Sequence, residues 1–241
     1  MSSEKLVLTE TRGKVACLTL NRPEKANAYN SQLLQELKAT LETLENDEQV
    51  NVLILTGAGN RNFCAGADLK ELRQKDHRTP LSLPSARLFE YLANFPKVTL
   101  AAINGNALAG GLEMALSCDL RICAENATFG LPEPSLGLIP AAGGTQNLTS
   151  LVGIAKAKEI ILGGKRWNAE KALTTGLVSE IHPSEELLTA AWNWAEKIST
   201  YDALALQLAK QAINLTQANS GGHRFEKAAQ ALLYELNNKK A

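Results

Sequence analysis

Several features that mark metal-binding, membrane or nucleic-acid-binding proteins are scarce in this chain of 241 residues. Its four cysteines contain no Cys-x-x-Cys spacing and its three histidines are scattered, which argues against a zinc site and for free thiols in a reducing compartment. No apolar run approaches the length of a membrane span. Lys+Arg and Asp+Glu are equal at 25 each, so no net charge would attract the chain to nucleic acid.

The first residues, MSSEKLVLTE, lack both the apolar segment of a signal peptide and the Arg-rich pattern of a transit peptide. We therefore expect a cytoplasmic protein. The composition is 45% hydrophobic and 21% charged, which is typical of a globular chain long enough to bury a full core.

The hydrophobic pattern predicts strands that alternate with helices. Residues 5–12 and 15–23 predict a hairpin, because they alternate in polarity on either side of a turn at Gly13. Asn30 is suited to cap an amphipathic helix over residues 31–47. Short apolar runs typical of buried strands follow at 50–57, 97–105 and 119–125. From Ala155 onward the pattern is mostly helical, so we expect an α/β fold of short ββα units with a helical C-terminal layer.

Two carboxylates draw attention to residues 104–133. Glu113 lies among apolar neighbours three residues after Gly110, and Glu133 follows a short apolar run. A buried carboxylate without a partner is costly, so Glu113 invites a functional explanation, although an isolated Glu is usually a solvated surface residue. Together the two residues are candidates for an acid–base pair.

Two Gly-rich turns each connect an apolar run to the start of a helix. One holds Ala67 and the other holds Gly110. Backbone amides in the first turn of a helix have no internal partner. If the two strands are neighbours, these amides would converge on one oxygen, as in an oxyanion hole. Taken singly, each turn is better explained as a strand-to-helix turn where glycine relieves backbone strain, and it is the combination with the two glutamates that favours a site.

The chain resembles the enoyl-CoA hydratase/isomerase (crotonase) superfamily over nearly its whole length. Four stretches in the family's order carry the resemblance: LNRPEKANAYN (20–30), FCAGADLKEL (63–72), AINGNALAGGLEMALSCDLRICAENATFGLPEPSLGLIPAAGGTQNL (102–148) and AKEIILGGKRWNAEKALTTGLVSEI (157–181).

The resemblance implies a crotonase (ClpP-like) spiral of ββα units, with a core domain and active site at 1–180 and a helical C-terminal region at 181–241. It assigns oxyanion-hole amides to Ala67 and Gly110 and catalytic carboxylates to Glu113 and Glu133. It also implies a segment that lines the coenzyme A site, formed by the following residues: Arg22, Lys25, Ala65, Gly66, Ala67, Asp68, Leu69, Lys70 and Gly110.

The implied reaction is reversible hydration of a 2-enoyl-CoA, in which coenzyme A is part of the substrate and no metal or redox cofactor takes part. We expect Glu133 to give the proton to Cα and Glu113 to act as the base that orients water, although the sequence leaves that order open. Isomerisation, or dehydration of a branched or carrier-bound acyl thioester, remains an alternative. A non-catalytic acyl-thioester or RNA-binding homologue is an alternative of another class. The family implies a homotrimer or a dimer of trimers, with no membrane or nucleic-acid partner.

The chain departs from the family pattern at three places. Ala109 replaces a glycine, which we expect to be tolerated unless the φ angle there must be positive. Asn147 replaces the usual arginine of a GGTQR motif. The chain stops at ALLYELNNKKA, so we expect a shortened C-terminal region. Cys64 lies beside the predicted hole, but it has no histidine neighbour in the sequence and is interpreted as a packing residue.

Overall fold

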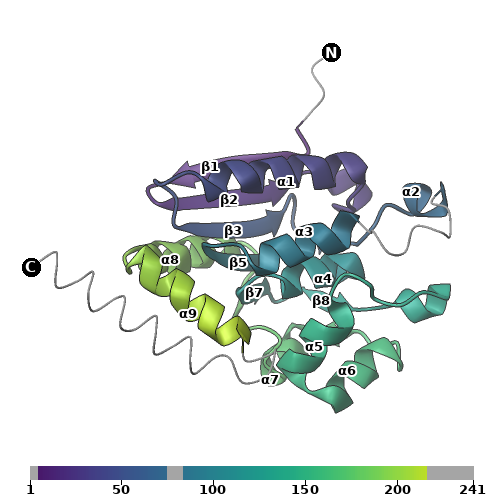
Figure 1. The fold of residues 1–241 in the computed structure, drawn as a ribbon. Helices are drawn as coiled ribbons and strands as arrows, with labels where there is room; N and C mark the ends of the chain where they lie inside the picture. Colours follow the sequence, from purple (N-terminus) through teal and green to yellow (C-terminus); the bar gives the residue numbers. More distant parts are fainter. Residues whose placement is uncertain (1–4, 75–83, 216–241) are drawn as a thin grey trace, which may run out of the picture.

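A six-stranded sheet forms the centre of the structure, a computed structural model that describes residues 5–74 and 84–215. Its strands are β1 (Val7–Arg12), β2 (Val15–Leu20), β3 (Val52–Gly57), β5 (Val98–Ile103), β7 (Leu120–Ala124) and β10 (Ile181–His182), in the order β1-β2-β3-β5-β7-β10. The β1–β2 hairpin is antiparallel and the remaining pairs are parallel. The predicted hairpin and buried parallel strands are therefore confirmed (Figure 1).

A second sheet is built from four short strands: β4 (Asn62–Cys64), β6 (Asn106–Leu108), β8 (Thr128–Gly130) and β9 (Trp167–Asn168), in the order β4-β6-β8-β9. Each of β3, β5 and β7 is followed in the chain by one strand of this second sheet. This repetition is the spiral of ββα units that the resemblance predicted.

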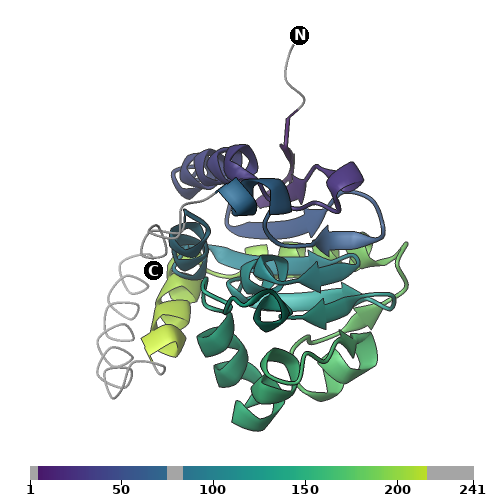
Figure 2. The same cartoon turned by 90° about the vertical axis from the view of Figure 1, so that its right-hand side faces the viewer.

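Nine α-helices cover the sheets within the described residues: α1 (Ser31–Glu45), α2 (Leu69–Gln74), α3 (Pro84–Ala93), α4 (Gly110–Leu116), α5 (Gly144–Val152), α6 (Ile154–Ile161), α7 (Ala169–Thr174), α8 (Leu187–Ser199) and α9 (Ala203–Leu215). The side chain of Asn30 caps α1 by accepting a hydrogen bond of 2.8 Å from the amide of Leu33, as predicted. Helices α5 to α7 lie at the opposite end of the molecule from β1, β2 and α1 (Figures 1 and 2).

Each face of the six-stranded sheet packs on a separate hydrophobic core. The larger core joins one face to α1, α3, α4 and the second sheet. On the other face, α8 buries Leu187, Ala191, Trp192 and Ala195. The helical C-terminal region thus begins with β10, an edge strand of the main sheet, and continues into α8, which packs on that sheet. Residues 216–241, which include the ending that we expected to be shortened, lie outside the described residues.

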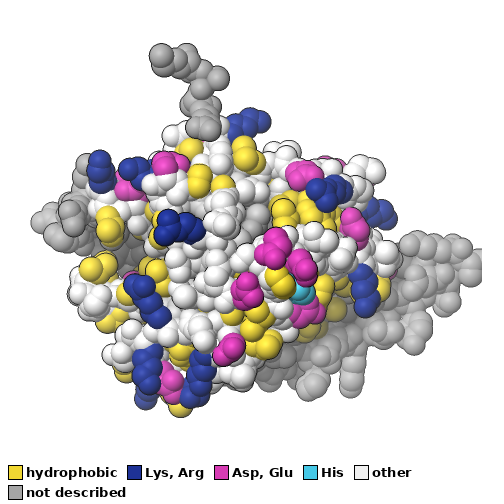
Figure 3. All heavy atoms as spheres, turned by 180° about the vertical axis from the view of Figure 1, so that it is seen from behind, with side chains coloured by type: hydrophobic (Ala, Val, Ile, Leu, Met, Phe, Trp, Pro, Cys, Tyr) yellow, Lys and Arg dark blue, Asp and Glu magenta, His cyan; other side chains and the backbone are white. Residues whose placement is uncertain are grey.

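Charged side chains of both signs are interspersed over the face shown in Figure 3, and apolar side chains lie between them. The described residues of this face form no continuous basic surface. None of the described helices is both long enough and apolar enough to cross a bilayer. In the same part of the chain, no group of three or more His, Cys, Asp or Glu side chains is arranged to hold a metal ion.

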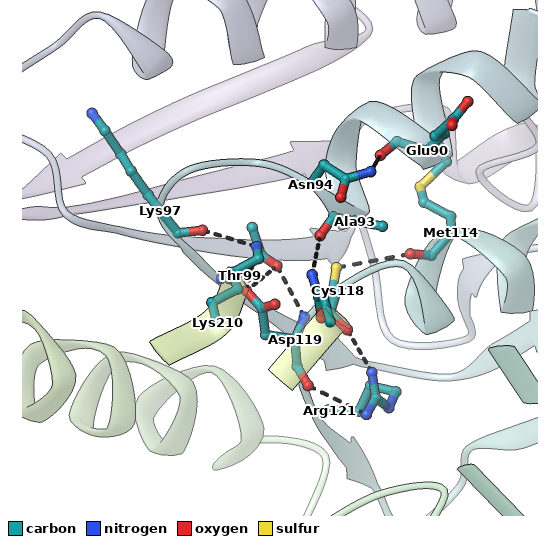
Figure 4. A network of polar contacts seen from close by, with 11 residues as sticks. Glu90, Ala93, Asn94, Lys97, Thr99, Met114, Cys118, Asp119, Arg121 and Lys210 are labelled. Carbon is teal, nitrogen blue, oxygen red and sulfur yellow. Dashed lines mark hydrogen bonds and ion pairs between the residues drawn. The ribbon is translucent and has the colours of Figure 1, made fainter. Parts of the chain in front are cut away.

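Helix α9 is attached to the core through a polar network at the start of β7 (Figure 4). Lys210 Nζ lies 2.8 Å from Asp119 Oδ2, and the lysine side chain is only 8% exposed. The same carboxylate oxygen accepts hydrogen bonds from the amide and the hydroxyl of Thr99. The guanidinium of Arg121 donates to the carbonyls of Cys118, Asp119 and Leu177. These contacts join the last described helix to β5 and β7.

Candidate active site

The turns that hold Ala67 and Gly110 touch each other. Strands β4 and β6, which lead into these turns, pair in parallel, and Cys64 lies opposite Ala107. A Cβ added to Gly66 would lie 2.9 Å from Cβ of Ala109 and 3.2 Å from the amide nitrogen of Gly110. The expectation that the two strands are neighbours is therefore confirmed. Whether the two amides bind one oxygen remains a prediction.

Two buried asparagines, which the sequence did not single out, fix the loop between β3 and β4. Asn104 donates from Nδ2 to the carbonyls of Gly57 (2.8 Å) and Gly59 (2.7 Å), and its Oδ1 accepts from the Gly57 amide at 3.1 Å. Asn27 donates to the carbonyl of Asn62 at 2.7 Å. Buried backbone groups need partners, and these side chains supply them where the strand ladder ends.

Ala109 has a positive φ. Its dihedral angles are φ 51° and ψ −132°, a region that side chains other than glycine rarely occupy. A positive φ is the case in which we did not expect alanine to be tolerated here, and the alanine is therefore strained. Its amide donates to the carbonyl of Gly130 at 2.9 Å, and it directly precedes Gly110 at the start of α4. Strain of this kind is stored immediately beside the candidate amide.

Helix α4 places Glu113 in its first turn, as the spacing from Gly110 predicted, and in the interior of the protein. All seven residues of this helix are buried, and Glu113 is only 4% exposed. Its Oε1 accepts hydrogen bonds from the amides of Ala142 (2.8 Å) and Gly144 (2.9 Å). Burial raises the pKa of Glu113, and these two amide hydrogen bonds oppose that effect by stabilising the charged form. The AAGGT stretch that supplies them carried no assignment from sequence.

Glu133 has a different environment. It is the first residue of a 3-10 helix, Glu133–Leu136, and is 9% exposed. Its Oε2 is buried and has no hydrogen-bond partner among the described residues. Burial raises the pKa of Glu133 to about 7; a hydrogen bond from its own amide opposes this effect, and the charge of Glu113 adds to it. The group is therefore about half protonated near neutral pH, with one oxygen free to receive a ligand or water.

The predicted coenzyme A segment is gathered around the Ala67 turn. Asp68 Oδ1 accepts from the amide of Lys70 at 3.0 Å, so this acid caps the start of α2. Arg22 lies 3.1 Å from Asp68 Oδ2 and also donates to the carbonyl of Ala28, which commits its guanidinium to holding the turn. The Lys70 amide and Arg22 lower the pKa of Asp68. Lys25 is exposed, and Leu69 is 56% exposed.

Cys64 is fully buried, and burial raises its pKa to about 12. A thiol in this state is inert, so the structure agrees with a packing role.

One hollow of the described structure lies apart from the residues assigned to the site, since neither Glu113 nor Glu133 lines it. It measures about 860 Å³ and lies between α3, α5, α9 and the start of β7. Ala142 and Gly143 form part of its wall, so it lies behind the loop whose amides bind Glu113. The Asp119–Lys210 pair also lines it. Neither Ala67 nor Gly110 lines this hollow.

Comparison with known proteins identifies the family. The family model for enoyl-CoA hydratase/isomerase matches residues 10–241. The chain is 42% identical over 210 residues to the short-chain-enoyl-CoA hydratase of Clostridium acetobutylicum, covering 86% of this chain and 80% of the relative. It is 43% identical over 211 residues to the 2,3-dehydroadipyl-CoA hydratase of Escherichia coli K12, covering 88% and 82%.

A solved structure agrees with these relatives. The crystal structure of enoyl-CoA hydratase from Bacillus anthracis superposes with a TM-score of 0.90 at 38% identity, covering 94% of this chain and 90% of that one. The chain therefore belongs to the enoyl-CoA hydratase/isomerase family and has the crotonase fold.

Proposed function

We propose that this protein is an enoyl-CoA hydratase, which adds water reversibly to a 2-enoyl-CoA thioester to give the 3-hydroxyacyl-CoA. The observation that carries the proposal is the pair of buried glutamates with unequal environments. Glu113 is anchored by two amides, whereas Glu133 has a free oxygen and a pKa raised to about 7. The relatives named as hydratases support it.

The substrate would bind with its thioester oxygen at the amides of Ala67 and Gly110. The thioester must lie there because that oxygen becomes negatively charged in the reaction. Preorganised donors are worth roughly 3–4 kcal/mol each at such an oxygen. The Ala65–Lys70 turn would lie along the coenzyme A moiety, and the exposed Lys25 would meet its phosphates. Arg22 would support this turn through Asp68.

In the proposed chemical step, water adds to Cβ and a proton adds to Cα. The water oxygen forms a bond to Cβ and its proton passes to Glu113. The electron pair of the double bond moves to Cα and the thioester, which gives an enolate whose oxygen the two amides stabilise. Cα takes the proton of Glu133 and completes the product. The enzyme ends with Glu113 protonated and Glu133 ionised, and one proton exchange restores the starting state.

This mechanism requires that Glu113 and Glu133 together carry a single proton. Burial and the charge of Glu113 raise the pKa of Glu133 toward neutrality, so Glu133 is the group that holds the proton. Two amide donors favour the charged form of Glu113. The geometry therefore supports Glu133 as the donor to Cα and Glu113 as the base.

The alternative functions would use the groups of this site in different ways. An isomerase moves one proton between two carbons and needs no activated water, so one of the two carboxylates would have no task. Dehydration of a branched or carrier-bound thioester uses the same groups in reverse and differs only in the acyl group or the carrier. A non-catalytic RNA-binding homologue would need a basic surface, and the face in Figure 3 provides no support for one.

We also propose a cytoplasmic homotrimer or dimer of trimers. Exposed apolar side chains next to Glu133 fit a protein contact, since Leu136 is 60% and Ile139 is 71% exposed. Light scattering coupled to size-exclusion chromatography would measure the assembly, and a monomer at micromolar concentration would contradict it.

Hydration is tested by the loss of the ultraviolet absorbance of crotonyl-CoA. Glu113→Gln and Glu133→Gln should each reduce kcat by about 10²-fold or more, as expected for loss of a positioned acid or base. Glu125→Gln is the matched control, because Glu125 is exposed and outside the site. The hydratase proposal fails if the wild type hydrates no member of a panel of coenzyme A and carrier-linked enoyl thioesters. Conversion of a 3-enoyl-CoA without hydration would favour the isomerase.

A further inference from the structure

Tyr29 touches both of the turns assigned to the oxyanion hole. Its backbone forms a parallel bridge with Ala67. The Tyr29 amide donates to the carbonyl of Gly66, and the Tyr29 carbonyl accepts from the amide of Asp68, both at 2.9 Å. The turn is therefore tied to Tyr29 on both sides of Ala67.

The side chain of Tyr29 reaches the other turn. The phenol oxygen occupies the place where a Cβ on Gly110 would lie, and Cζ and Cε1 of the ring are 2.8 Å and 2.9 Å from that same point. No larger side chain fits at Gly110 while the phenol is in place. The Tyr29 side chain thus lies directly against the Gly110 backbone.

The phenol is held firmly. Tyr29 is 7% exposed and packs edge-to-face on Phe89, with ring centroids 5.7 Å apart. The next residue, Asn30, caps α1, which fixes the backbone on the C-terminal side. Burial raises the pKa of the phenol, and the charges of Glu113 and Glu133 add to the effect. The hydroxyl is therefore neutral.

We propose that Tyr29 is a positioning residue that holds the two amides of the oxyanion hole at a fixed separation. Its backbone holds one turn and its ring holds the other. The inference rests on the proposed function, because it assumes that the amides of Ala67 and Gly110 bind one oxygen. Displacement of a reacting group by about 1 Å costs on the order of 10²-fold in rate, so a spacer between two donors has a large effect on catalysis.

The test compares Tyr29→Leu with Tyr29→Phe in crotonyl-CoA hydration. The leucine variant removes the contact with Gly110, so kcat should fall about 10- to 100-fold while KM stays within about twofold, because the hole acts mainly in the transition state. The phenylalanine variant keeps the ring and should retain at least about a third of kcat. Phe95→Leu is the matched control: Phe95 is equally buried in the same core, packs on Tyr91, and should leave kcat unchanged.

A double-mutant cycle tests the contact itself. Gly110→Ala places a methyl group where the phenol oxygen lies. This substitution should therefore reduce kcat less in the Tyr29→Leu background than in the wild type. Equal effects in both backgrounds would mean that the phenol does not set the position of Gly110, and would overturn the proposal.

A second readout separates this proposal from the proposed function. Acetoacetyl-CoA forms an enolate whose oxygen the hole would bind, and its ultraviolet spectrum reports that polarisation without turnover. The wild type should enhance the enolate band, and Tyr29→Leu should lose most of the enhancement while still binding the ligand. If the wild type enhances the band but hydrates nothing, only the hydratase proposal fails. If Tyr29→Leu keeps kcat, or keeps the band, the positioning role is wrong.

Discussion

The amide of Gly144 donates a hydrogen bond of 2.9 Å to Oε1 of Glu113, across 31 residues of sequence. Gly144 is the first residue of α5, so the positive end of a helix faces the carboxylate. The amide of Ala142 donates to the same oxygen at 2.8 Å. Oε1 of Glu113 thus accepts hydrogen bonds from two backbone amides. These bonds fix the orientation of the carboxylate and therefore the direction in which its other oxygen points.

Gly144→Ala tests this anchoring. An added Cβ would lie 2.8 Å from Oε1 of Glu113 and 2.9 Å from Cβ of Pro140, so the carboxylate must move. We expect kcat for hydration to fall about 10- to 100-fold, as for other small displacements of a catalytic group. Gly130→Ala is the control, because its Cβ would meet no atom closer than 3.4 Å. Equal kcat for both variants would show that Glu113 needs no precise orientation.

The pH dependence of catalysis follows from the proton on Glu133. Its pKa is raised to about 7. In the proposed mechanism only the singly protonated pair of glutamates is active. In both directions kcat/KM should fall as pH rises above about 7, because Glu133 loses its proton. The reverse reaction starts from the same total number of protons on the pair, so its profile should have the same alkaline limb. Profiles that diverge between the two directions above neutral pH would contradict the assignment.

The stability of the fold should also depend on Glu133. Folding raises its pKa from the ordinary 4.5 to about 7, so the native state favours the protonated form. Glu133 therefore makes its full contribution to stability below its ordinary pKa of 4.5, and this contribution is lost as the pH rises through about 7. Glu133→Gln cannot ionise, so relative to the wild type it should gain roughly 1–3 kcal/mol between about pH 5 and pH 9. Urea unfolding at several pH values measures this difference. A pH-independent difference would mean that the folded carboxyl titrates normally.

The elements that hold the site were predictable because local sequence determines them. Short continuous apolar runs identified β3, β5 and β7, and the spacing of Gly110 and Glu113 placed both residues in the first turn of α4. The contacts across the fold were not predictable. The amides of Ala142 and Gly144 have no side-chain signal, and the approach of Tyr29 to Gly110 depends on tertiary packing between distant segments.

Ala109→Gly should stabilise the protein, because glycine adopts the positive φ of 51° without a steric penalty. The expected gain is about 1 kcal/mol, since relief of strain exceeds the entropy that an extra glycine adds to the unfolded chain. Ala107→Gly is the matched control two residues earlier: it is buried in β6 without a positive φ and should lose about 1 kcal/mol. Urea unfolding of both variants decides the matter, and a loss at position 109 would show that the alanine is not strained.

Lys210→Met should loosen α9, because it leaves the partly buried carboxylate of Asp119 with Thr99 as its remaining side-chain partner among the described residues (Figure 4). The two side chains are 8% and 21% exposed, so water replaces the lost charge poorly. Removal of one member of such a pair should cost about 2–4 kcal/mol, measured by urea unfolding. Adding Asp119→Asn should recover part of this loss, because the remaining charge is then also removed. Lys156→Met is the control, since the Lys156–Glu159 pair is more exposed and solvent replaces it, so its unfolding curve should match the wild type. If Lys210→Met unfolds like this control, α9 is held by its apolar contacts and not by the ion pair.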